Sequence, residues 1–403
     1  MDALTTPLPK DWEVKTFRDI STINQGLQIP ISQRLKAPTE HAKFYITIQA
    51  LNNRKEFEYI KTYNESVVCH KDDILMTRTG NTGMVITNIE GVFHNNFFKI
   101  NFDRTLINKD FLVYFLSLEQ TQKTILKKAG TSTIPDLNHN DFYSLLIPLP
   151  PLNEQIAIAN ILSDVDRYLY SLDALILKKE SVKKALSFEL LSQRKRLKGF
   201  NQAWQRVRLG DICEITTGSL DANEMVHYGK YRFYTCAKEY YFIDKYAFDT
   251  EAILISGNGA YVGYVHYYKG KFNAYQRTYV LDNFSEHIIF VKYFLTMFLQ
   301  SHIQTNKNEG NTPYIVMATL KDFEIPLPPL NEQIAIANIL SDVDNEIISL
   351  KNKKRQFENI KKALNHDLMS AKIRVLKELT PQKSRTNPLI KETPKLKSLR
   401  ERS

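Results

Sequence analysis

Apolar and polar residues alternate in short stretches over two parts of this chain. Each part opens with a similar phrase, Trp12–Ile20 in one and Trp204–Ile212 in the other. Each later carries two apolar runs joined by a glycine-rich loop, at residues 73–86 and 252–265. Short alternating runs separated by Gly or Asn predict β-strands and turns.

A helical pattern follows the strands in each part. The first helix is expected over residues 108–129, with Asn108 as its N-cap and Gly130 just past its end. The second is expected over 285–304, started by Ser285 and Glu286. Both globular parts are therefore predicted to be α+β.

Twenty residues, IPLPPLNEQIAIANILSDVD, occur twice without a mismatch, at Ile147–Asp166 and at Ile325–Asp344. The offset of 178 residues indicates two units in tandem. Many apolar combinations fill a core, so an identical block favours two equal surfaces for two copies of one partner. Recent gene conversion would leave the same mark. The residues expected to face the partner are Leu152, Asn153, Glu154, Gln155, Leu330, Asn331, Glu332 and Gln333.

Each repeat continues into a long helix with one apolar stripe. The prolines of the repeat forbid a helix before Leu152, and neither Gly nor Pro follows until Gly199 and Pro381, which predicts helices of about 45 residues. The stripe has coiled-coil spacing, which favours antiparallel pairing of the two helices over two unrelated helices packed on their own domains. The expected seam consists of Ile158, Leu162, Val165, Leu169, Leu172, Ile336, Leu340, Val343, Ile347 and Leu350.

These patterns divide the chain into five segments. Globular parts are expected at 1–146 and 201–324, and helical segments at 147–200 and 325–378. Residues 379–403 carry seven basic and two acidic groups, half of the net charge of +10, and their composition predicts a disordered tail. The fold class is thus α+β, with two globular domains separated by two long antiparallel coiled-coil helices in a pseudo-twofold internal repeat.

Composition is that of an ordinary globular protein, with 43% apolar and 24% charged residues. The three cysteines have no pairing or metal spacing, and no signal peptide or apolar run of membrane-spanning length is evident. We therefore expect a cytoplasmic protein that does not enter a membrane.

The sequence contains no catalytic constellation. It has no P-loop, HExxH or CxxC motif, and its histidines are scattered singly. Its glycine phrases lack the spacing of a dinucleotide-binding loop, so an enzyme with its own active site, cofactor or metal is not expected.

Binding is the remaining class of function. Amides, arginine and aromatics adjoin predicted strands in FHNNFFKI (93–100) and AYQRTYVL (274–281), and such side chains can pair with bases in the major groove. A core role is the alternative for the aromatics. The expected DNA-binding residues are Arg78, Thr79, Asn81, Asn95, Asn96, Lys230, Arg232, Lys238, Ser256, Asn258, Tyr261, Gln276 and Arg277.

Over residues 10–378 the chain resembles the specificity subunits of type I restriction-modification systems. The resemblance lies in FYITIQAL (44–51), DILMTRTGNTG (73–83), GTSTIPDL (130–137) and the repeated LPPLNEQ with its long helix. In the second half it lies in the phrase from Tyr231 to Val265 and in FNAYQRTYVL (272–281).

The resemblance implies a non-catalytic subunit whose two target recognition domains each read one half of a bipartite DNA site. It implies helices that set the spacer and dock two modification subunits, joined by two restriction subunits. The assembled complex would methylate adenine N6 and cut DNA in an ATP-dependent manner, with S-adenosylmethionine, ATP and Mg²⁺ held by the partners. The alternatives are a subunit of a fused nuclease–methyltransferase and a protein-binding coiled-coil adaptor.

Overall fold

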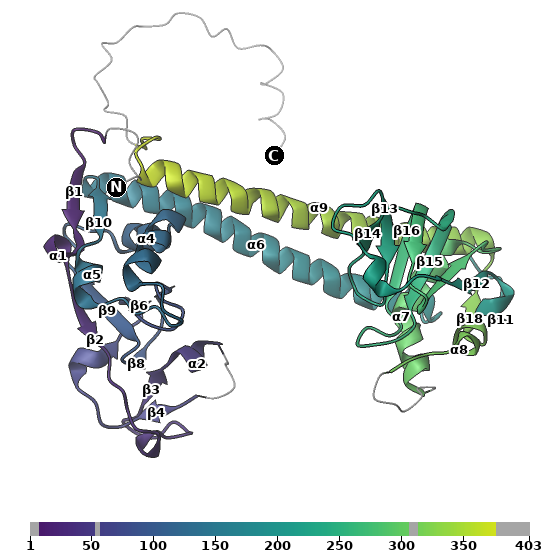
Figure 1. Cartoon of the computed structure of the whole chain (residues 1–403), viewed down its shortest axis with the longest axis horizontal. Coiled ribbons are helices and arrows are strands. Elements are labelled where there is room, and N and C mark those ends of the chain that lie inside the picture. The colour runs from purple at the N-terminus through teal and green to yellow at the C-terminus, as the bar shows by residue number, and fades with distance from the viewer. Residues whose placement is uncertain (1–7, 53–56, 306–312, 376–403) are drawn as a thin grey trace, which may run out of the picture. The chain divides into compact units, whose positions relative to one another are not determined.

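The structure, a computed structural model, describes residues 8–52, 57–305 and 313–375 (Figure 1). The chain divides into two compact units: unit 1 comprises residues 1–169 with 356–403, and unit 2 comprises 170–355. The division falls inside the two long helices and so differs from the five segments expected from sequence. The reason is that each globular part packs one end of both helices into its own core.

Unit 1 contains two four-stranded sheets and a two-stranded ribbon. One sheet has the order β2-β9-β6-β7 and the other β4-β3-β8-β5, while β1 pairs with β10. The strands are β1 (Glu13–Thr16), β2 (Ser21–Gln25), β3 (Lys43–Ile46), β4 (Tyr59–Ile60), β5 (Val68–Cys69), β6 (Ile74–Thr77), β7 (Val85–Ile86), β8 (Gly91–Phe93), β9 (Phe97–Phe102) and β10 (Leu146–Leu149). The helices are α1 (Phe17–Ile20), α2 (Ile48–Asn52), α3 (Lys109–Leu116), α4 (Glu119–Ala129) and α5 (His139–Tyr143).

Unit 2 contains one six-stranded sheet of order β12-β17-β15-β16-β13-β14, and the ribbon β11-β18. The strands are β11 (Gln205–Arg208), β12 (Glu214–Thr217), β13 (Tyr231–Tyr234), β14 (Tyr241–Ile243), β15 (Phe248–Ser256), β16 (Val265–Ala274), β17 (Thr278–Asp282) and β18 (Glu324–Leu327). The helices are α7 (Ile288–Thr305) and α8 (Met317–Lys321). Both units are α+β, as the sequence predicts.

The single helix expected over 108–129 is instead two, α3 and α4. Asn108 caps α3 as predicted, because its side chain accepts a hydrogen bond from the Phe111 amide, and Gly130 follows α4 with a φ of 89°. Leu118 adopts an extended conformation and interrupts the helix. In unit 2 the helix begins at Ile288, later than expected, because the Ser285 hydroxyl bonds the Ile212 carbonyl rather than capping the helix.

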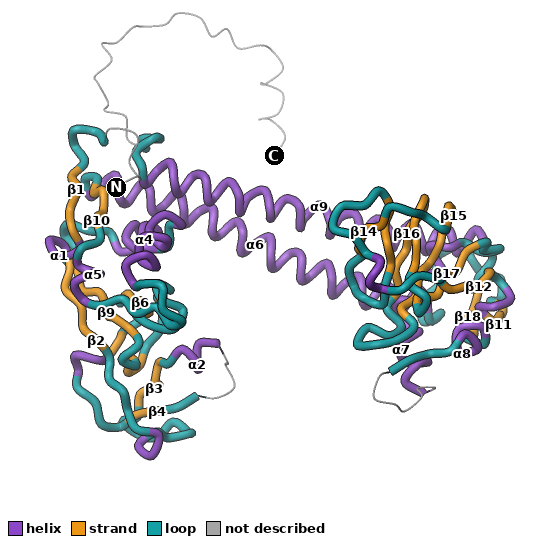
Figure 2. Tube along the Cα trace, viewed as in Figure 1, coloured by secondary structure: helices purple, strands orange, loops and turns teal. Residues whose placement is uncertain are grey.

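The two long helices are α6 (Leu152–Leu191) and α9 (Leu330–Met369), each of 40 residues and uninterrupted (Figure 2). The expected length of about 45 residues is too long. Gln193 and Ala371 lie two residues past the helix ends with φ of 63° and 57°, in the left-handed region that terminates helices. Both helices therefore stop before Gly199 and Pro381.

The two helices run antiparallel in each unit. In unit 2, Lys183 pairs with Asp344 at 2.5 Å and Lys354 pairs with Asp173 at 2.7 Å, so residue numbers rise on α6 as they fall on α9. In unit 1, Lys361 pairs with Asp166 at 2.5 Å. The Lys361–Asp166 and Lys183–Asp344 pairs occupy equivalent positions of the repeat, so the register is the same at both ends.

The expected seam lies along these contacts. Six of its residues are buried and the other four are half-buried, as a seam requires. The buried ones are Ile158, Leu162, Leu172, Ile336, Leu340 and Ile347, and the half-buried ones are Val165, Leu169, Val343 and Leu350. Farther along the two helices, Val182 and Ile360 are 48% and 50% exposed, whereas Leu190 and Leu368 are buried.

Each unit contains a buried glutamate carboxylate that links distant segments of its sequence. Glu154, at the start of α6, accepts hydrogen bonds from the Trp12 indole at 3.1 Å and from the Arg374 guanidinium at 2.7 and 2.9 Å. Glu332, at the start of α9, accepts from Trp204 at 3.2 Å and from Arg196 at 2.9 and 2.7 Å. We call each set a carboxylate clamp. Each clamp joins one helix start, the segment after the other helix and the residue just before the first strand of a globular part.

Gln155 and Gln333 are buried in the same places. The Gln155 side chain accepts from the Asn108 amide and donates to the carbonyls of Leu106 and Pro150. Gln333 accepts from the His287 amide and donates to the Pro328 carbonyl. The expectation that Glu154, Gln155, Glu332 and Gln333 face a partner is thus wrong, because their polar atoms are used inside the unit. Of the expected partner-facing residues, only Leu152, Asn153, Leu330 and Asn331 reach the surface.

Replacing Arg374 by Ala should destabilise unit 1 by about 3 kcal/mol, because it strands the buried Glu154 carboxylate without its cation. Arg196→Ala should destabilise unit 2 to a similar extent. Arg206→Ala is the matched control, since Arg206 and Glu324 form an exposed pair whose loss should cost less than about 1 kcal/mol. Denaturant unfolding of the three variants measures the difference, and equal stabilities would contradict the role of the clamps.

Candidate nucleic-acid interface

The glycine-rich loops of the two units are held in the same way. In unit 1 the loop joins β6 to β7, and Gly83 N–H donates to the Thr77 carbonyl at 2.8 Å. In unit 2 the loop joins β15 to β16, and Gly263 N–H donates to the Ser256 carbonyl at 2.7 Å. A helix glutamine supports each loop: Gln122 of α4 bonds the Gly83 carbonyl, and Gln300 of α7 bonds the Val262 carbonyl, both at 2.7 Å.

A tight turn lies against each glycine loop. We name the turns at His94–Phe97 and Tyr275–Thr278 the recognition turns. Each has a closing hydrogen bond, of 3.0 Å from Phe97 N–H to the His94 carbonyl and of 2.8 Å from Thr278 N–H to the Tyr275 carbonyl. The tips of the turns are Asn95-Asn96 in unit 1 and Gln276-Arg277 in unit 2.

Backbone bonds hold each turn to its loop. Arg78 N–H donates to the Asn96 carbonyl at 2.7 Å, and Gly257 N–H donates to the Arg277 carbonyl at 2.8 Å. A third segment joins on the other side, since Leu137 N–H donates to the Arg78 carbonyl and Ile315 N–H to the Gly257 carbonyl. Each unit therefore carries one three-segment cluster with the same backbone connections.

In unit 1 the structure brings Arg78, Thr79, Asn81, Asn95 and Asn96 into one cluster, but most are partly covered. The Arg78 guanidinium is tied to Asp136 at 2.7 Å and lies 5.7 Å from the centre of the Phe98 ring. Thr79 is half-buried and bridges to Asp136, whereas Asn81 is exposed with a φ of 53°.

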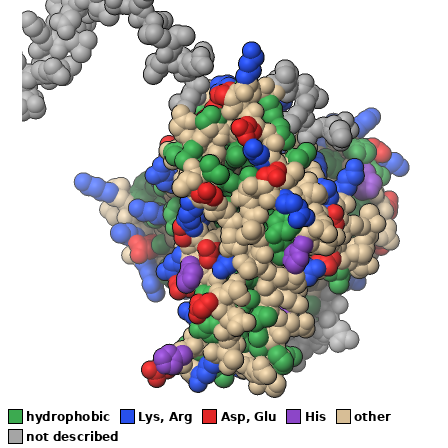
Figure 3. Space-filling model, turned by 90° about the vertical axis from the view of Figure 1, so that its left-hand side faces the viewer, with side chains coloured by type: hydrophobic (Ala, Val, Ile, Leu, Met, Phe, Trp, Pro, Cys, Tyr) green, Lys and Arg blue, Asp and Glu red, His purple; other side chains and the backbone are tan. Residues whose placement is uncertain are grey.

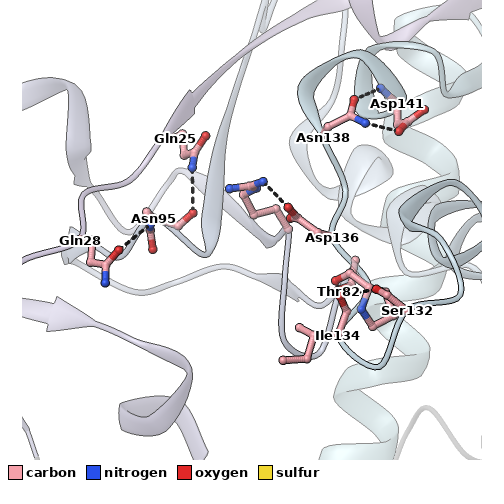
Figure 4. Close-up of polar contacts among 11 residues, drawn as sticks. Gln25, Gln28, Thr82, Asn95, Ser132, Ile134, Asp136, Asn138 and Asp141 are labelled. Carbon is pink, nitrogen blue, oxygen red and sulfur yellow. Dashed lines mark hydrogen bonds and ion pairs between the residues drawn. The ribbon is translucent and has the colours of Figure 1, made fainter.

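The amide of Asn95 turns back toward the fold. Its Nδ2 donates to Gln28 Oε1 at 3.4 Å, and its Oδ1 is buried without a partner among the described residues (Figure 4). Gln25 also donates to the Asn95 carbonyl at 3.3 Å. This turn is thus backed by two further amide side chains, that of Gln25 at the end of β2 and that of Gln28 in the segment that follows.

In unit 2 the cluster is more open. Gln276, Arg277, Tyr261 and Lys238 are exposed, and Lys238 lies 5.1 Å from the centre of the Tyr261 ring. Asn258 is half-buried and bridges to Tyr314. The Cys236 thiol donates to the Arg277 carbonyl, which places the segment of Cys236 and Lys238 beside the recognition turn.

Three residues expected to bind DNA are placed otherwise. Ser256 is fully buried, because it ends the central strand β15. Arg232 lies between the rings of Tyr240 and Tyr268, 4.3 and 4.4 Å from their centres, and therefore serves packing. Lys230 is exposed just before β13, and within the described residues it makes no hydrogen bond or ion pair with the cluster.

Sequence reasoning missed several residues that build the clusters. Gln28, Asp136 and Tyr314 contact or bridge to expected residues, and Gln122 and Gln300 support the loops. The two glutamines lie 178 residues apart, the same offset as the repeat, as do Asp136 and Tyr314. Of these residues, only Gln122 and Gln300 are identical at this offset, so only they carry a sequence signal of a shared role.

The ionisable groups near the turns do not form a reactive centre. Burial lowers the pKa of His94 and of His266, which favours neutral rings that serve as hydrogen-bonding groups. Outside the turns, just before β12, burial raises the pKa of the Cys213 thiol to about 12, far from the range of a nucleophile. Within the described residues no group of three or more His, Cys, Asp or Glu side chains could hold a metal ion.

Charge is mixed on the one face that Figure 3 draws. Figure 3 shows Lys and Arg interspersed with Asp and Glu on the face turned to the viewer, rather than gathered in one basic patch.

None of the described helices combines the length and apolar character that a membrane span requires.

Comparison with known proteins gives a consistent picture. A family model described as type I restriction modification DNA specificity domain matches residues 9–179 and 201–359. The EcoDI specificity subunit of Escherichia coli is 37% identical over 170 residues, which span 41% of this chain and 37% of that protein. The MjaVIII specificity subunit of Methanocaldococcus jannaschii is 25% identical over 415 residues, covering 91% of this chain and 94% of that protein.

Solved structures share the fold. The S subunit of a type I restriction-modification system from M. genitalium aligns with a TM-score of 0.59 at 19% identity, covering 90% of this chain and 98% of that one. A chain from a study of complex assembly in a type I system aligns with a TM-score of 0.55 at 17% identity, covering 90% and 99%.

Proposed function

We propose a division of labour within this chain from the premise that it belongs to the type I restriction-modification DNA specificity family. Members of this family are non-catalytic DNA sequence-recognition subunits. We propose that the cluster of unit 1 reads one half of a bipartite site and that the cluster of unit 2 reads the other. The observation that supports this is the pair of equal backbone frames that carry different side chains at their tips.

The wider assembly is also part of the proposal. Modification subunits with S-adenosylmethionine would methylate adenine N6, and restriction subunits with ATP and Mg²⁺ would cut DNA, in the cytoplasm. Two copies of each partner are proposed because the repeat occurs twice. The fused nuclease–methyltransferase remains the second candidate, since a specificity chain of the same design could serve it.

The exposed face of the repeat is the surface we propose for the modification subunits. Four positions of each copy are exposed and spaced by three or four residues, which places them on one side of the helix. They are Asn153, Ile156, Asn160 and Asp164 on α6, and Asn331, Ile334, Asn338 and Asp342 on α9. Ile156 and Ile334 are 41% and 38% exposed, so each copy offers the same apolar centre with a polar surround.

DNA recognition is tested with the chain assembled with its modification partner. Binding to a duplex that carries both half-sites should weaken steeply with salt and should exceed binding to a scrambled duplex by about 10³-fold or more. Methylation sequencing in cells supplies the half-sites. Equal affinity for the two duplexes at every salt concentration would contradict the proposal and favour the protein-binding adaptor.

A second prediction concerns the helices as a ruler. Deleting one heptad from both, Val165–Ser171 and Val343–Ser349, keeps the apolar spacing but shortens each helix by about 10 Å. The non-specific spacer of the methylated motif should shorten by about 3 base pairs while both half-sites persist. An unchanged spacer in an active complex would contradict the ruler.

A third prediction concerns partner number. Ile156→Asp or Ile334→Asp alone should leave one modification subunit bound, and the double variant none, because a charge would be buried in the contact. Native mass spectrometry reports the stoichiometry. Ile31→Asp, at an isoleucine 76% exposed outside the helices, is the control and should keep both subunits. Two subunits on the double variant would place docking elsewhere.

A further inference from the structure

The two recognition turns share no residue at equivalent positions, but their backbone hydrogen bonds match. The closing bond, the bond to the glycine loop and a third bond are equivalent in the two units: His94 N–H donates to the Ile46 carbonyl and Tyr275 N–H to the Tyr234 carbonyl, both at 2.9 Å. Gly26 and Gly218 lie so close behind the turns that a Cβ would stand 2.2 and 1.9 Å from a backbone oxygen. The turns are therefore fixed in place from several sides.

Two turns with the same backbone hydrogen bonds but different tip residues distinguish two kinds of DNA contact. The phosphate backbone is the same in both half-sites, so a phosphate contact gives no reason for the tips to differ. Base edges differ between half-sites, so the residues that read them must differ too. The tips differ, with Asn95-Asn96 in unit 1 and Gln276-Arg277 in unit 2, and both tip residues of unit 2 are exposed. Phe97 and Thr278, which also differ, are fully buried and so cannot reach a base.

Arg277 has the anchored backbone and exposed side chain that a base contact requires. Its carbonyl is occupied by Gly257 N–H and by the Cys236 thiol, which anchor the residue through its backbone. Its guanidinium has no hydrogen bond or ion pair to any residue in the described ranges, and the side chain is exposed. A hollow of about 200 Å³, lined by Gly257, Gln276, Arg277, Tyr279 and Ile315, opens beside the tip.

The arginine of unit 1 has a different role. Arg78 stands where unit 2 has Gly257, and it is held by Asp136 and half-buried. At position 257 a Cβ would come within 2.4 Å of the Arg277 carbonyl oxygen, so no side chain fits there. The cluster of unit 2 therefore carries its guanidinium on the turn rather than on the glycine loop.

We propose that Arg277 reads a guanine of the second half-site in the major groove, with Gln276 beside it on the neighbouring base pair. An arginine fork can bond guanine O6 and N7 together, and a glutamine can pair with adenine N6 and N7. The inference rests on the proposed function, because it names the base chosen by one of its two clusters.

The test uses the chain assembled with its modification partner and duplexes that vary each base of the methylated motif. The wild type should require guanine, read as cytosine on the other strand, at one position of the second half-site. Arg277→Ala should reduce discrimination at that position alone by about 5- to 150-fold and leave the first half-site unchanged. Arg277→Lys keeps the charge but not the fork, and should lose the discrimination too.

Arg206→Ala is the matched control, since it removes an exposed arginine of the same unit, on β11, and its motif should stay intact. The first half-site reports whether each variant still folds and assembles. A uniform loss of affinity over all duplexes, with a salt slope smaller by about one, would make Arg277 a phosphate contact and overturn the inference. An unchanged motif would overturn it as well. A wild type without any sequence preference would instead overturn the proposed function.

Discussion

A buried carboxylate that must be neutralised determines how each unit is closed. Glu154 and Glu332 are 1% and 0% exposed, and each is satisfied by one arginine and one tryptophan from distant parts of the sequence. An ionised carboxyl without such partners would be too costly to bury. The clamps therefore force a helix start, the segment after the opposing helix and the residue just before the first strand together. The antiparallel register, and with it the position of each globular part on its helix ends, follows from this requirement.

The same requirement explains the identical repeat. Because the two copies of the repeat are identical, the sequence indicated a surface that binds two copies of one partner. Its glutamates and glutamines are buried instead. The glutamates accept hydrogen bonds from the Trp indoles and the arginines. The glutamines accept from the backbone amides of Asn108 and His287. Only one side of each repeat is left for contact with another protein. One segment thus serves packing on one face and offers a matching surface on the other.

Sequence reasoning predicted periodic features better than local ones. Strand and helix classes, the seam and the antiparallel pairing follow from apolar spacing, which burial enforces over many residues. The helix ends were misplaced because left-handed residues such as Gln193 and Ala371 carry no proline or glycine signal. Both Arg277 and Arg232 lie beside or within predicted strands, so the sequence assigned them the same expected role. In the structure Arg277 is exposed, whereas Arg232 lies between two tyrosine rings. That distinction depends on tertiary contacts that the order of residues does not reveal.

The central claim is that two equal frames present unequal tips to the two halves of one DNA site. The most direct measurement is an experimental structure of the chain with its modification partner on its methylated DNA motif. We expect the turns at 94–97 and 275–278 each to enter a major groove, one in each half-site. A complex in which either turn faces away from the duplex, while the bases are contacted by other segments, would contradict it.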